Sequence, residues 1–442
     1  MTKEEILKEI DKEGIKFIRL QFVDIMGIPK NVEIPVSEIE NALDNGVLFD
    51  GSSIEGFVRI DESDMLLVPD TNTFSVLPWT TAGSPVARII CDVKKPDGTP
   101  FLGDPRYILK REMEKVKKEF GYTMNAGPEA EFFLFKRDED GNPTTITHDS
   151  GNYFDLLPRD LGEKVREEIV TTLQRMGFEV EAAHHEGAEG QHEIDFRYTD
   201  ALRTADNVIT FKLVTKTIAL KYNLHATFMP KPVRGINGSG MHTNLSLFNE
   251  KGENIFYDKN GKFELSDEAL YFIGGILKHA RGISFIANPL VNSYKRLVPG
   301  YEAPVYISWA LRNRSALIRV PAARGKATRV EFRSPDPSCN PYLAFALMLA
   351  AGVDGIRNKI DPKEPINIDI YDLADEDRRK MGIKTLPGNL MEAMEEFLKD
   401  SVLVETIGEH IVEKLVDAKK KEWEDFRIHV TDWELKRYLC IY

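Results

Sequence analysis

The sequence predicts an α+β protein made of two modules of unequal size. In the first hundred residues, short segments of alternating apolar residues are interleaved with short amphipathic helices, which is typical of a compact α+β unit. Further along the chain the predicted helices are longer, and strands still separate them. We therefore expect one module at residues 1–103 and a second at residues 104–442.

Helix-capping residues predict where several of these elements begin. Thr2 and Glu5 have the spacing of a capping box, which predicts a helix at the amino terminus. Asp104 followed by Pro105 is a typical N-cap and first helical position, and Gly121 predicts the end of that helix. We place the boundary between the modules just before this second helix.

The composition excludes some classes of function. The formal net charge is −13, which argues against a general nucleic-acid binder and against a protein of the membrane surface. The three cysteines are far apart and lack a CxxC spacing, so neither a disulfide framework nor a zinc knuckle is expected. The first residues contain no apolar signal segment. We therefore expect a cytoplasmic protein.

The first candidate site lies on a segment predicted to be one strand, residues 127–135, which reads GPEAEFFLF. Glu129 and Glu131 are two apart and would share a face of that strand. Two carboxylates beside a buried apolar segment repel each other and lose hydration unless a cation lies between them. Oxygen ligands of this kind suit Mg²⁺ or Mn²⁺. The alternative is a pair of exposed glutamates at a strand end.

A second cluster of possible metal ligands is the segment HHEGAEGQHE at residues 184–193. Its glycines permit close approach of the backbone, and Glu186 and Glu193 can converge on one ion if strands flank the loop. An exposed polar loop is the alternative interpretation.

A glycine- and serine-rich run, NGSGMH at residues 237–242, could expose backbone N–H groups to an anion. It is neither a P-loop nor a dinucleotide-binding fingerprint, because the spacing is wrong and a strand follows. His242 begins that alternating strand.

Residues 296–333 contain many basic side chains, which is unexpected in an acidic protein. Guanidinium groups bind phosphate and carboxylate oxygens in pairs of hydrogen bonds. Glu331 and Arg333 are two apart, so a metal ligand and an anion ligand could share one face. Surface salt bridges are the alternative, but the surrounding strands are strongly apolar.

An acidic loop in the first module reads FDGSSIEGF, residues 49–57. Asp50 in this loop and Asp64 after it are candidate ligands for ammonium or acceptors of a proton. A turn with capping acids is the alternative. Carboxylates for a divalent metal combined with arginines for anions predict a metal-dependent, ATP-using enzyme without a P-loop.

With these residues identified, the chain resembles the type I glutamine synthetases of bacteria and archaea. The resemblance begins near residue 15 and reaches the carboxyl terminus. It rests on motifs in the same order: FDGSSIEGF, GPEAEFFLF, HHEGAEGQHE, NGSGMH, NSYKRLVPGYEAP, RNRSALIRVP and RVEFRSPDPSCNPYL. It implies an amino-terminal β-grasp domain and a catalytic domain of antiparallel strands surrounded by helices. It also implies a dodecamer of two hexameric rings, with active sites shared between neighbouring subunits.

The implied reaction joins ammonia to L-glutamate through γ-glutamyl phosphate, giving glutamine, ADP and phosphate. The resemblance also assigns roles to residues of this sequence. The implied ligands of one cation are Glu131, Glu186 and Glu193, and those of a second are Glu129, His242 and Glu331. The implied contacts with ATP are Glu181, Asn244, Ser246, Arg314, Arg319, Lys326 and Arg329. The implied contacts with glutamate are Asn237, Gly238, Arg296, Glu302 and Arg333.

Catalysis is implied for five of the residues of this sequence. Asp50 and Asp64 would bind ammonium and take its proton, and Glu302 would lie on a flap that excludes water. Arg314 and Arg333 would stabilise the transferring phosphoryl group.

The regulation implied is feedback inhibition by glutamine through Arg59, as in the short subgroup of the family. The residues after Tyr371 differ from those of the adenylylated subgroup, so we expect no adenylylation. PII-type or other regulatory proteins are possible partners. Two alternatives remain: a γ-glutamyl ligase acting on a polyamine or another amine, and a non-catalytic nitrogen-sensing regulator with the same fold.

Overall fold

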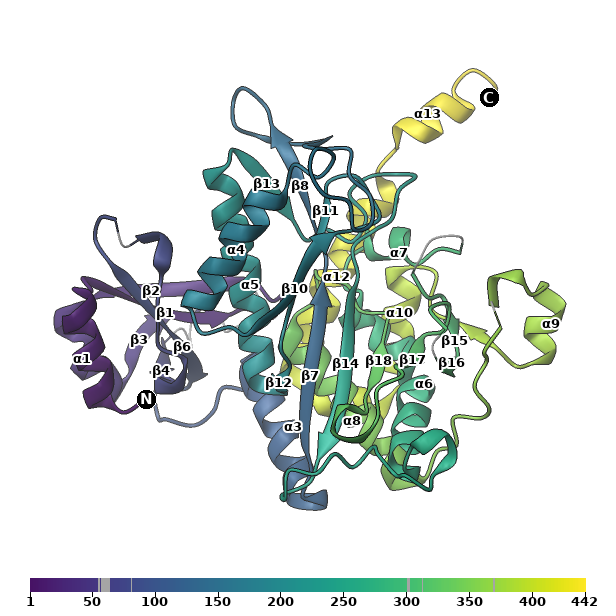
Figure 1. The fold of residues 1–442 in the computed structure, drawn as a ribbon, viewed down its shortest axis with the longest axis horizontal. Helices are drawn as coiled ribbons and strands as arrows, with labels where there is room; N and C mark the ends of the chain where they lie inside the picture. The colour runs from purple at the N-terminus through teal and green to yellow at the C-terminus, as the bar shows by residue number, and fades with distance from the viewer. Residues whose placement is uncertain (55, 57–63, 81, 300–302, 312, 369) are drawn as a thin grey trace.

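The structure is a computed structural model that describes residues 1–54, 56, 64–80, 82–299, 303–311, 313–368 and 370–442 (Figure 1). Arg59 and Glu302, two of the residues expected to act in regulation and catalysis, lie outside the described residues.

The amino-terminal part of the chain forms one mixed sheet covered by helices. The elements are α1 (Lys3–Glu13), β1 (Phe17–Val23), β2 (Pro29–Pro35), α2 (Ile39–Asn45), β3 (Val47–Asp50), β4 (Asp64–Pro69), β5 (Ser75–Val76) and β6 (Val86–Lys94). The strand order is β2-β1-β6-β4-β3, and β5 also pairs with β6. Only the pair of β1 and β6 is parallel among these described strands. Ile6 and Ile10 of α1 are buried in the core of this unit.

Two sheets form the centre of the larger, carboxyl-terminal part. Their strands are β7 (Thr123–Ala130), β8 (Phe132–Arg137), β9 (Pro143–Thr147), β10 (Val180–His185), β11 (Gln191–Phe196), β12 (Thr199–Asp200), β13 (Leu224–Thr227), β14 (Met241–Phe248), β16 (Trp309–Leu311), β17 (Ile318–Val320) and β18 (Val330–Phe332). One sheet has the order β12-β7-β14-β18-β17-β16, and the other has the order β10-β11-β8-β13 with β9 beside β8. Their pairs are antiparallel except β16 with β17. A separate short pair joins β15 (Tyr306–Ile307) to β19 (Lys384–Thr385).

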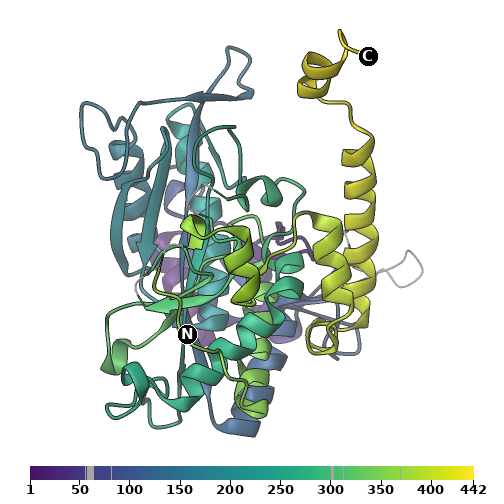
Figure 2. The ribbon, with the colours of Figure 1, turned by 90° about the vertical axis from the view of Figure 1, so that its right-hand side faces the viewer.

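Helices surround these sheets (Figures 1 and 2). They are α3 (Pro105–Phe120), α4 (Glu163–Arg175), α5 (Ala201–Lys221), α6 (Asp267–Ala287), α7 (Ser293–Arg296), α8 (Pro341–Asn358), α9 (Asp375–Lys380), α10 (Leu390–Leu398), α11 (Ser401–Ile407), α12 (Glu409–Ile428) and α13 (Asp432–Tyr438). Figure 2 shows α13 beyond the end of α12, projecting away from the rest of the molecule.

The predicted helix boundaries are confirmed. Thr2 Oγ1 accepts a hydrogen bond from Glu5 N, and the Glu5 carboxylate accepts one from Thr2 N, which completes the capping box. Asp104 caps α3 by accepting from Arg106 N at 3.0 Å, and Gly121 ends the helix in the left-handed region, with φ of 70°. The division into modules at residue 103 stays a prediction.

The expected single strand at residues 127–135 is wrong. The chain leaves the six-stranded sheet at Ala130 and enters the other sheet at Phe132, so Glu131 lies between β7 and β8. Glu131 N donates to the Gly240 carbonyl at 3.0 Å, which satisfies the backbone at this break. The period of two places Glu129 and Glu131 on one face, but it cannot reveal that the strand changes partners between them.

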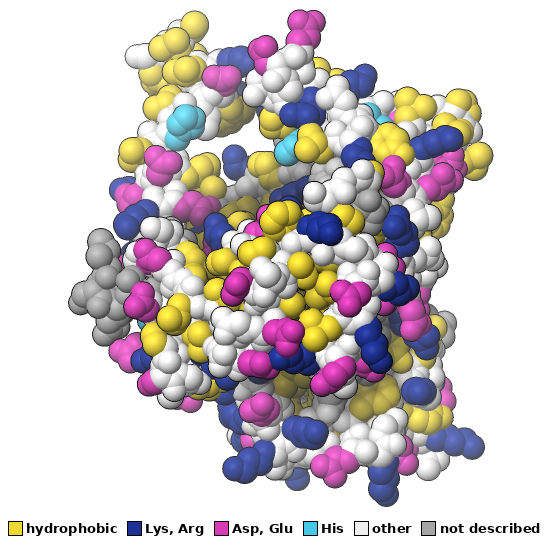
Figure 3. Space-filling model, turned by 90° about the vertical axis from the view of Figure 1, so that its left-hand side faces the viewer, with side chains coloured by type: hydrophobic (Ala, Val, Ile, Leu, Met, Phe, Trp, Pro, Cys, Tyr) yellow, Lys and Arg dark blue, Asp and Glu magenta, His cyan; other side chains and the backbone are white. Residues whose placement is uncertain are grey.

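Neither sign of charge dominates the face shown in Figure 3, where acidic and basic side chains are interspersed among apolar ones. Within the described part of the chain, no helix is both long and apolar enough to span a membrane.

Candidate active site

Three neighbouring strands bring the first group of ligand-capable side chains together. Glu129 on β7 lies opposite His242 on β14, and β14 in turn pairs with β18, which carries Glu331. One ligand-capable atom from each of the three side chains lies within 4.8 Å of the others. His242 Nδ1 is 4.0 Å from a carboxylate oxygen of Glu129 and 3.9 Å from one of Glu331.

Burial controls the protonation of this group. Burial, together with the charge of Glu331, raises the pKa of Glu129 to about 7. Burial and the neighbouring guanidinium groups hold the pKa of His242 well below its usual range, so its imidazole is neutral and able to bind a cation. Glu331 is fully buried, and its carboxylate pairs with Arg319 and with Arg333 Nη1.

A second group of carboxylates surrounds Glu131. Its Oε2 accepts hydrogen bonds from Gln191 Nε2 at 2.8 Å and from Gly240 N at 2.9 Å. Burial and the charge of Glu186 raise the pKa of Glu131 to about 8. Burial and its acidic neighbours, including Glu131, also raise the pKa of Glu193 well above its usual range.

His184 lies between two members of this second group. Its Nδ1 is 3.5 Å from a carboxylate oxygen of Glu186, and its Nε2 is 3.4 Å from one of Glu193. Glu186 and Glu193 thus lie at the two nitrogens of one imidazole ring.

The donor chemistry of both groups fits divalent cations. Several carboxylates are buried within interaction distance of one another, and their raised pKa values show how unfavourable it is to ionise all of them together. Oxygen donors with one neutral imidazole are ligands that Mg²⁺ and Mn²⁺ accept. A bound cation would favour the ionised carboxylates and so remove the repulsion.

Two cavities adjoin these groups. The first, of about 230 Å³, lies along β7, β11 and β14. It is lined by five residues expected to contact the nucleotide: Glu181, Asn244, Ser246, Lys326 and Arg329. Asn244 Nδ2 donates to Glu129 Oε1 at 2.8 Å, and Asn244 Oδ1 accepts from Arg329 Nε at 3.0 Å. Asn244 therefore connects this cavity to the first carboxylate group.

The second cavity is smaller and polar. It contains Glu131, Glu186 and His242 together with three residues expected to contact glutamate: Asn237, Gly238 and Arg296. Arg296 is 3% exposed and donates from Nη1 to the Ser334 carbonyl at 2.8 Å, which fixes its guanidinium in the wall. Any Cβ at Gly238 would lie 2.3 Å from the Pro230 carbonyl oxygen, so a larger residue does not fit there.

Two of the expected anion-binding arginines are already engaged, because Arg319 and Arg333 pair with Glu331. Arg314 is exposed and interacts electrostatically with Tyr153 and His242.

The two acids expected to bind ammonium lie together but away from the cavities. Asp50 on β3 and Asp64 on β4 are opposite each other in register, and both are exposed. Asp50 accepts from Ser52 N at 2.8 Å, and this hydrogen bonding lowers the pKa of Asp50. Neither residue lines either of the two cavities described above.

A larger apolar cavity, of about 470 Å³, lies elsewhere, between the β1–β2 turn, α5, α8 and α12. It contains none of the residues predicted for the site.

Two residues that face the site were not predicted from the sequence. Gln191 binds Glu131 and also donates to the Gly238 carbonyl at 3.2 Å. Asp195 lines the cavity of about 230 Å³ and lies near Glu193 and His184. Both residues are on β11 at a spacing of two from Glu193, so the alternation that selected Glu129 and Glu131 could have identified them.

Comparison with known proteins gives matches along the whole chain. Residues 14–96 match the glutamine synthetase β-grasp domain, and residues 102–438 match the glutamine synthetase catalytic domain. The chain is 59% identical to the glutamine synthetase of Thermus thermophilus, with 100% of this chain and 99% of that protein covered. It is 57% identical to the glutamine synthetase of Thermotoga maritima, with 100% of both chains covered.

Solved structures share the fold of this chain over nearly its whole length. A GmaS/ADP complex superposes with a TM-score of 0.88 at 33% identity, covering 98% of each chain. Plasmodium falciparum glutamine synthetase superposes with a TM-score of 0.88 at 28% identity, covering 99% of each chain.

The fold and the grouping of carboxylates, imidazole and arginines define a metal-dependent ligase that uses ATP. The domain matches span most of the sequence, and the curated relatives share more than half of its residues. The chain belongs to the glutamine synthetase family. This confirms the resemblance and the predicted α+β fold with an amino-terminal β-grasp domain.

Proposed function

We propose a division of work among the residues of this chain for the reaction of its family, the ATP-dependent synthesis of glutamine from glutamate and ammonia. The enzyme is a glutamate–ammonia ligase that uses ATP together with Mg²⁺ or Mn²⁺. One observation supports the assignment of residues: buried carboxylates with raised pKa values lie beside a cavity that Arg296 lines.

The carboxylate groups would hold two cations. Glu131, Glu186 and Glu193 are the proposed ligands of one, and Glu129, His242 and Glu331 are the proposed ligands of the other. When bound, the cations would supply positive charge beside the phosphate oxygens of the nucleotide. Arg319 and Arg333, which pair with Glu331, would fix the orientation of that carboxylate.

ATP would occupy the cavity of about 230 Å³ along β7, β11 and β14. Glu181, Asn244, Ser246, Lys326 and Arg329 line it, and the basic pair among them suits phosphate. The structural relative that was solved with ADP supports a nucleotide site in this fold. Arg314 and Arg319, which do not line this cavity, are the other two residues proposed to contact ATP.

Glutamate would bind in the smaller cavity. Asn237, Gly238 and Arg296 line it, and Arg333 lies next to Arg296, whose Nη2 donates to the Arg333 carbonyl at 3.3 Å. These groups would hold the substrate carboxylates so that the γ-carboxylate meets the terminal phosphate of ATP. Arg314 and Arg333 would stabilise the charge that spreads over the phosphoryl group during transfer.

The transfer gives γ-glutamyl phosphate and ADP. Asp50, supported by Asp64, would bind ammonium and take one proton from it, leaving ammonia free to attack the acyl carbon and expel phosphate. Glu302, which lies outside the described residues, is proposed to help close the site and keep water from the acyl phosphate.

The separation of Asp50 from both cavities supports an active site shared between two subunits. Asp50 is exposed on β3 and would reach the cavities of a neighbouring copy. We accordingly propose that the chain assembles as a dodecamer of two hexameric rings. Residues 1–103 would then be the module that supplies the ammonium site, and residues 104–442 the module that holds the other substrates.

The remaining proposals concern location and regulation. A cytoplasmic location follows from the cysteine usage and the need for ATP. Inhibition by glutamine through Arg59 is proposed from sequence alone, as is contact with PII-type or other regulatory proteins.

The test is phosphate release from ATP in the presence of glutamate and Mg²⁺, with ammonium, without it, and with methylamine or putrescine in its place. We expect turnover that requires ammonium and yields glutamine. Asp50→Ala should lower kcat by about 100-fold, the scale of a lost acid–base group. Asp97→Ala is the matched control, because Asp97 is also an exposed aspartate that accepts from the backbone N–H two residues further on, Thr99 N at 2.9 Å.

Other outcomes would overturn parts of this proposal. Turnover only with the amines would assign the chain to the γ-glutamyl-amine ligases. Nucleotide binding without turnover under any condition would favour a regulator. Equal activity of Asp50→Ala and Asp97→Ala would remove Asp50 from the ammonium site.

A further inference from the structure

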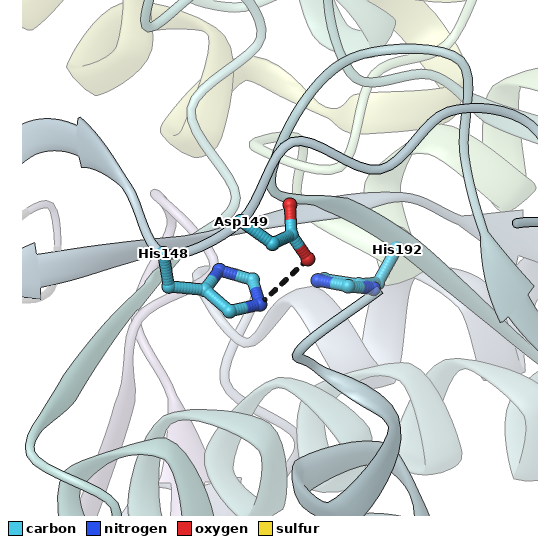
Figure 4. A group of neighbouring side chains, drawn as sticks. All are labelled: His148, Asp149 and His192. Carbon is cyan, nitrogen blue, oxygen red and sulfur yellow. Dashed lines mark ion pairs between the residues drawn. The ribbon is translucent and has the colours of Figure 1, made fainter. Parts of the chain in front are cut away.

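A buried cluster of imidazoles around one carboxylate lies next to the proposed metal centre. Figure 4 shows His148 and His192 with their rings directed toward Asp149. His185 approaches the same carboxylate, with Nε2 3.3 Å from Asp149 Oδ1. The side chains of Asp149, His185 and His192 are fully buried.

The chain at residues 149–162 is pressed closely onto these rings. A Cβ at Gly151 would lie 2.5 Å from His185 Nε2, and a Cβ at Gly162 would lie 2.4 Å from His192 Cε1. Larger residues at either position would displace the imidazoles. The contact between this segment and the β10–β11 hairpin is therefore a tightly packed one.

The donor set is that of a zinc site, but the protonation is not. Arg166 Nη1 lies 2.8 Å from His192 Nδ1, and a guanidinium can only donate, so Nδ1 must be the acceptor. The hydrogen of His192 is then on Nε2, which has no hydrogen-bond partner among the described residues, and a protonated nitrogen cannot bind a metal. Arg166 is itself fixed by two hydrogen bonds to Asp160, of 3.0 and 2.6 Å. The cluster therefore has another role.

Asp149 connects the cluster to the loop between β10 and β11, residues 186–190. Its Oδ1 accepts from Gly190 N at 2.9 Å, at the far end of that loop. The same oxygen accepts from His185 Nε2, while His185 Nδ1 donates to the Glu186 carbonyl at 2.7 Å. Both partners of His185 are acceptors, so this imidazole donates at both nitrogens. It therefore connects the Asp149 carboxylate to the backbone of Glu186.

The other oxygen of Asp149 binds two residues outside this loop, Leu161 and His148. Oδ2 accepts from Leu161 N at 3.3 Å and forms an ion pair with His148 Nε2 at 3.0 Å. His148 is fixed in turn, because its Nδ1 lies 3.0 Å from the Leu134 carbonyl oxygen on β8. Asp149 thus joins three segments of backbone.

Both ends of the loop that Asp149 holds carry residues of the proposed metal centre. Glu186 begins the loop, and its side chain lines the same small cavity as Glu131 and Gln191. Gln191 follows Gly190 and donates to Glu131 Oε2 at 2.8 Å. A shift of this loop would move Glu186 and the hydrogen bond to Glu131 together.

We propose that Asp149 is a positioning residue for the metal centre: it holds the 186–190 loop so that the Glu186 carboxylate faces Glu131. This inference rests on the proposed assignment of Glu131 and Glu186 as ligands. Groups that orient metal ligands in this way typically contribute 10-fold to 100-fold to metal affinity.

The test is direct titration of the purified protein with Mn²⁺, followed by electron paramagnetic resonance, without substrates. Asp149→Asn should raise the Kd of the Glu186-containing site by about 10-fold to 100-fold. The matched control is Asp354→Asn on α8. Asp354 is also a buried aspartate that binds an imidazole, His279 Nε2 at 3.0 Å, and it lines neither site cavity. Asp354→Asn should lower Tm and leave the Mn²⁺ Kd unchanged.

A double variant separates positioning from general loss of stability. If Asp149 acts through Glu186, adding Asp149→Asn to Glu186→Gln should cause little further loss of Mn²⁺ affinity. An unchanged Mn²⁺ Kd in Asp149→Asn, with only Tm lowered, would overturn the inference. If Asp149→Asn does not fold, His185→Gln tests the same connection and should raise the Kd as well. Unchanged Mn²⁺ binding by Glu131→Gln and Glu186→Gln would instead refute the proposed metal centre itself.

Discussion

At the scale of single residues, burial makes the carboxylates of the candidate active site difficult to ionise. Glu129 and Glu131 have pKa values of about 7 and about 8, against an ordinary value of 4.5. In the unfolded chain both carboxylates are hydrated and lose their protons near the ordinary value. Folding without a cation therefore retains protons that the unfolded chain has already released.

This difference makes the stability of the metal-free protein depend on pH. Between about pH 5 and pH 8 the folded state binds more protons than the unfolded state, so the free energy of unfolding falls as pH rises. A cation replaces those protons, and saturation at 100 times its Kd should add about 2.7 kcal/mol. Thermal unfolding in EDTA should therefore show Tm falling toward pH 8, and the Tm gain with Mg²⁺ should be larger at pH 8 than at pH 5.5.

The variant Glu131→Gln serves as the control for this prediction. Glutamine cannot ionise, so the variant should lose part of the pH dependence in EDTA and part of the stabilisation by Mg²⁺. Equal pH profiles with and without Mg²⁺ would contradict the assignment of these carboxylates.

At the scale of elements, the catalytic module depends on the close approach of α6 and α8. A Cβ at Gly275 of α6 would lie 2.1 Å from the Ala351 carbonyl oxygen and 2.7 Å from Gly355 N. Both neighbours are backbone atoms of α8, so they cannot move aside as a flexible side chain can. Glycine is therefore required for the two helices to touch at this point.

We expect Gly275→Ala to destabilise the protein despite its better helix propensity. Alanine gains about 1 kcal/mol in a helix interior, but overpacking typically costs about 1–3 kcal/mol, and contacts with a rigid backbone place this substitution at the upper end of that range. Chemical denaturation should therefore show a net loss of stability. Gly83→Ala is the control, since a Cβ there meets no described atom within 4 Å. Equal stability of the two variants would show that α6 can move away from α8 without penalty.

The same scale shows what could be predicted from the sequence. Local chemistry identified helix ends, because the Thr2 capping box and the Asp104 N-cap depend only on adjacent residues. Alternation placed Glu129 and Glu331 on faces of strands that the structure then brings together. The break at Glu131 depends on which strands pair, and that is decided by contacts distant in sequence. For the same reason, the link from Asp149 to Gly190 has no local signal.

At the scale of the whole molecule, the position of Asp50 predicts how chains of two kinds should complement each other. Asp50→Ala chains would lack the proposed ammonium site, and Glu129→Gln chains would lack a proposed metal ligand, so each alone should be nearly inactive. Suppose that every active site uses Asp50 from one chain and Glu129 from its neighbour. In random assemblies of equal amounts of the two chains, each of these residues is intact at about half of the sites, so about a quarter of the sites have both. Glutamine synthesis should therefore recover to about a quarter of the wild-type value.

The mixing experiment needs proof that mixed assemblies form, which two affinity tags on the two kinds of chain provide. Recovery of activity in doubly tagged assemblies would support the shared site. Absence of recovery in those assemblies would place Asp50 and Glu129 in the same chain's active site.

The exposed apolar residues at the carboxyl terminus support a second prediction about assembly. Leu439, Ile441 and Tyr442 are 71%, 70% and 98% exposed, and no residue of α13 is buried in the isolated chain. A helix of seven residues is not stable alone in water. Covering the adjacent apolar side chains with another surface would lower the free energy of the assembly. In the proposed dodecamer of two rings, a second copy in the opposite ring is the partner that closed symmetry supplies most directly.

Deleting residues 431–442 should therefore separate the rings of the proposed dodecamer without unfolding the chain. Because α13 buries nothing in the isolated chain, circular dichroism should remain that of the full-length protein. Sedimentation velocity should show the particle mass falling to about half, from dodecamer to hexamer. The paired substitution Leu439→Asp with Ile441→Asp should have the same effect, because it places charges in the proposed contact and leaves the chain length intact. A mass unchanged in both variants would mean that other surfaces hold the rings together and that the exposed terminus serves a different partner.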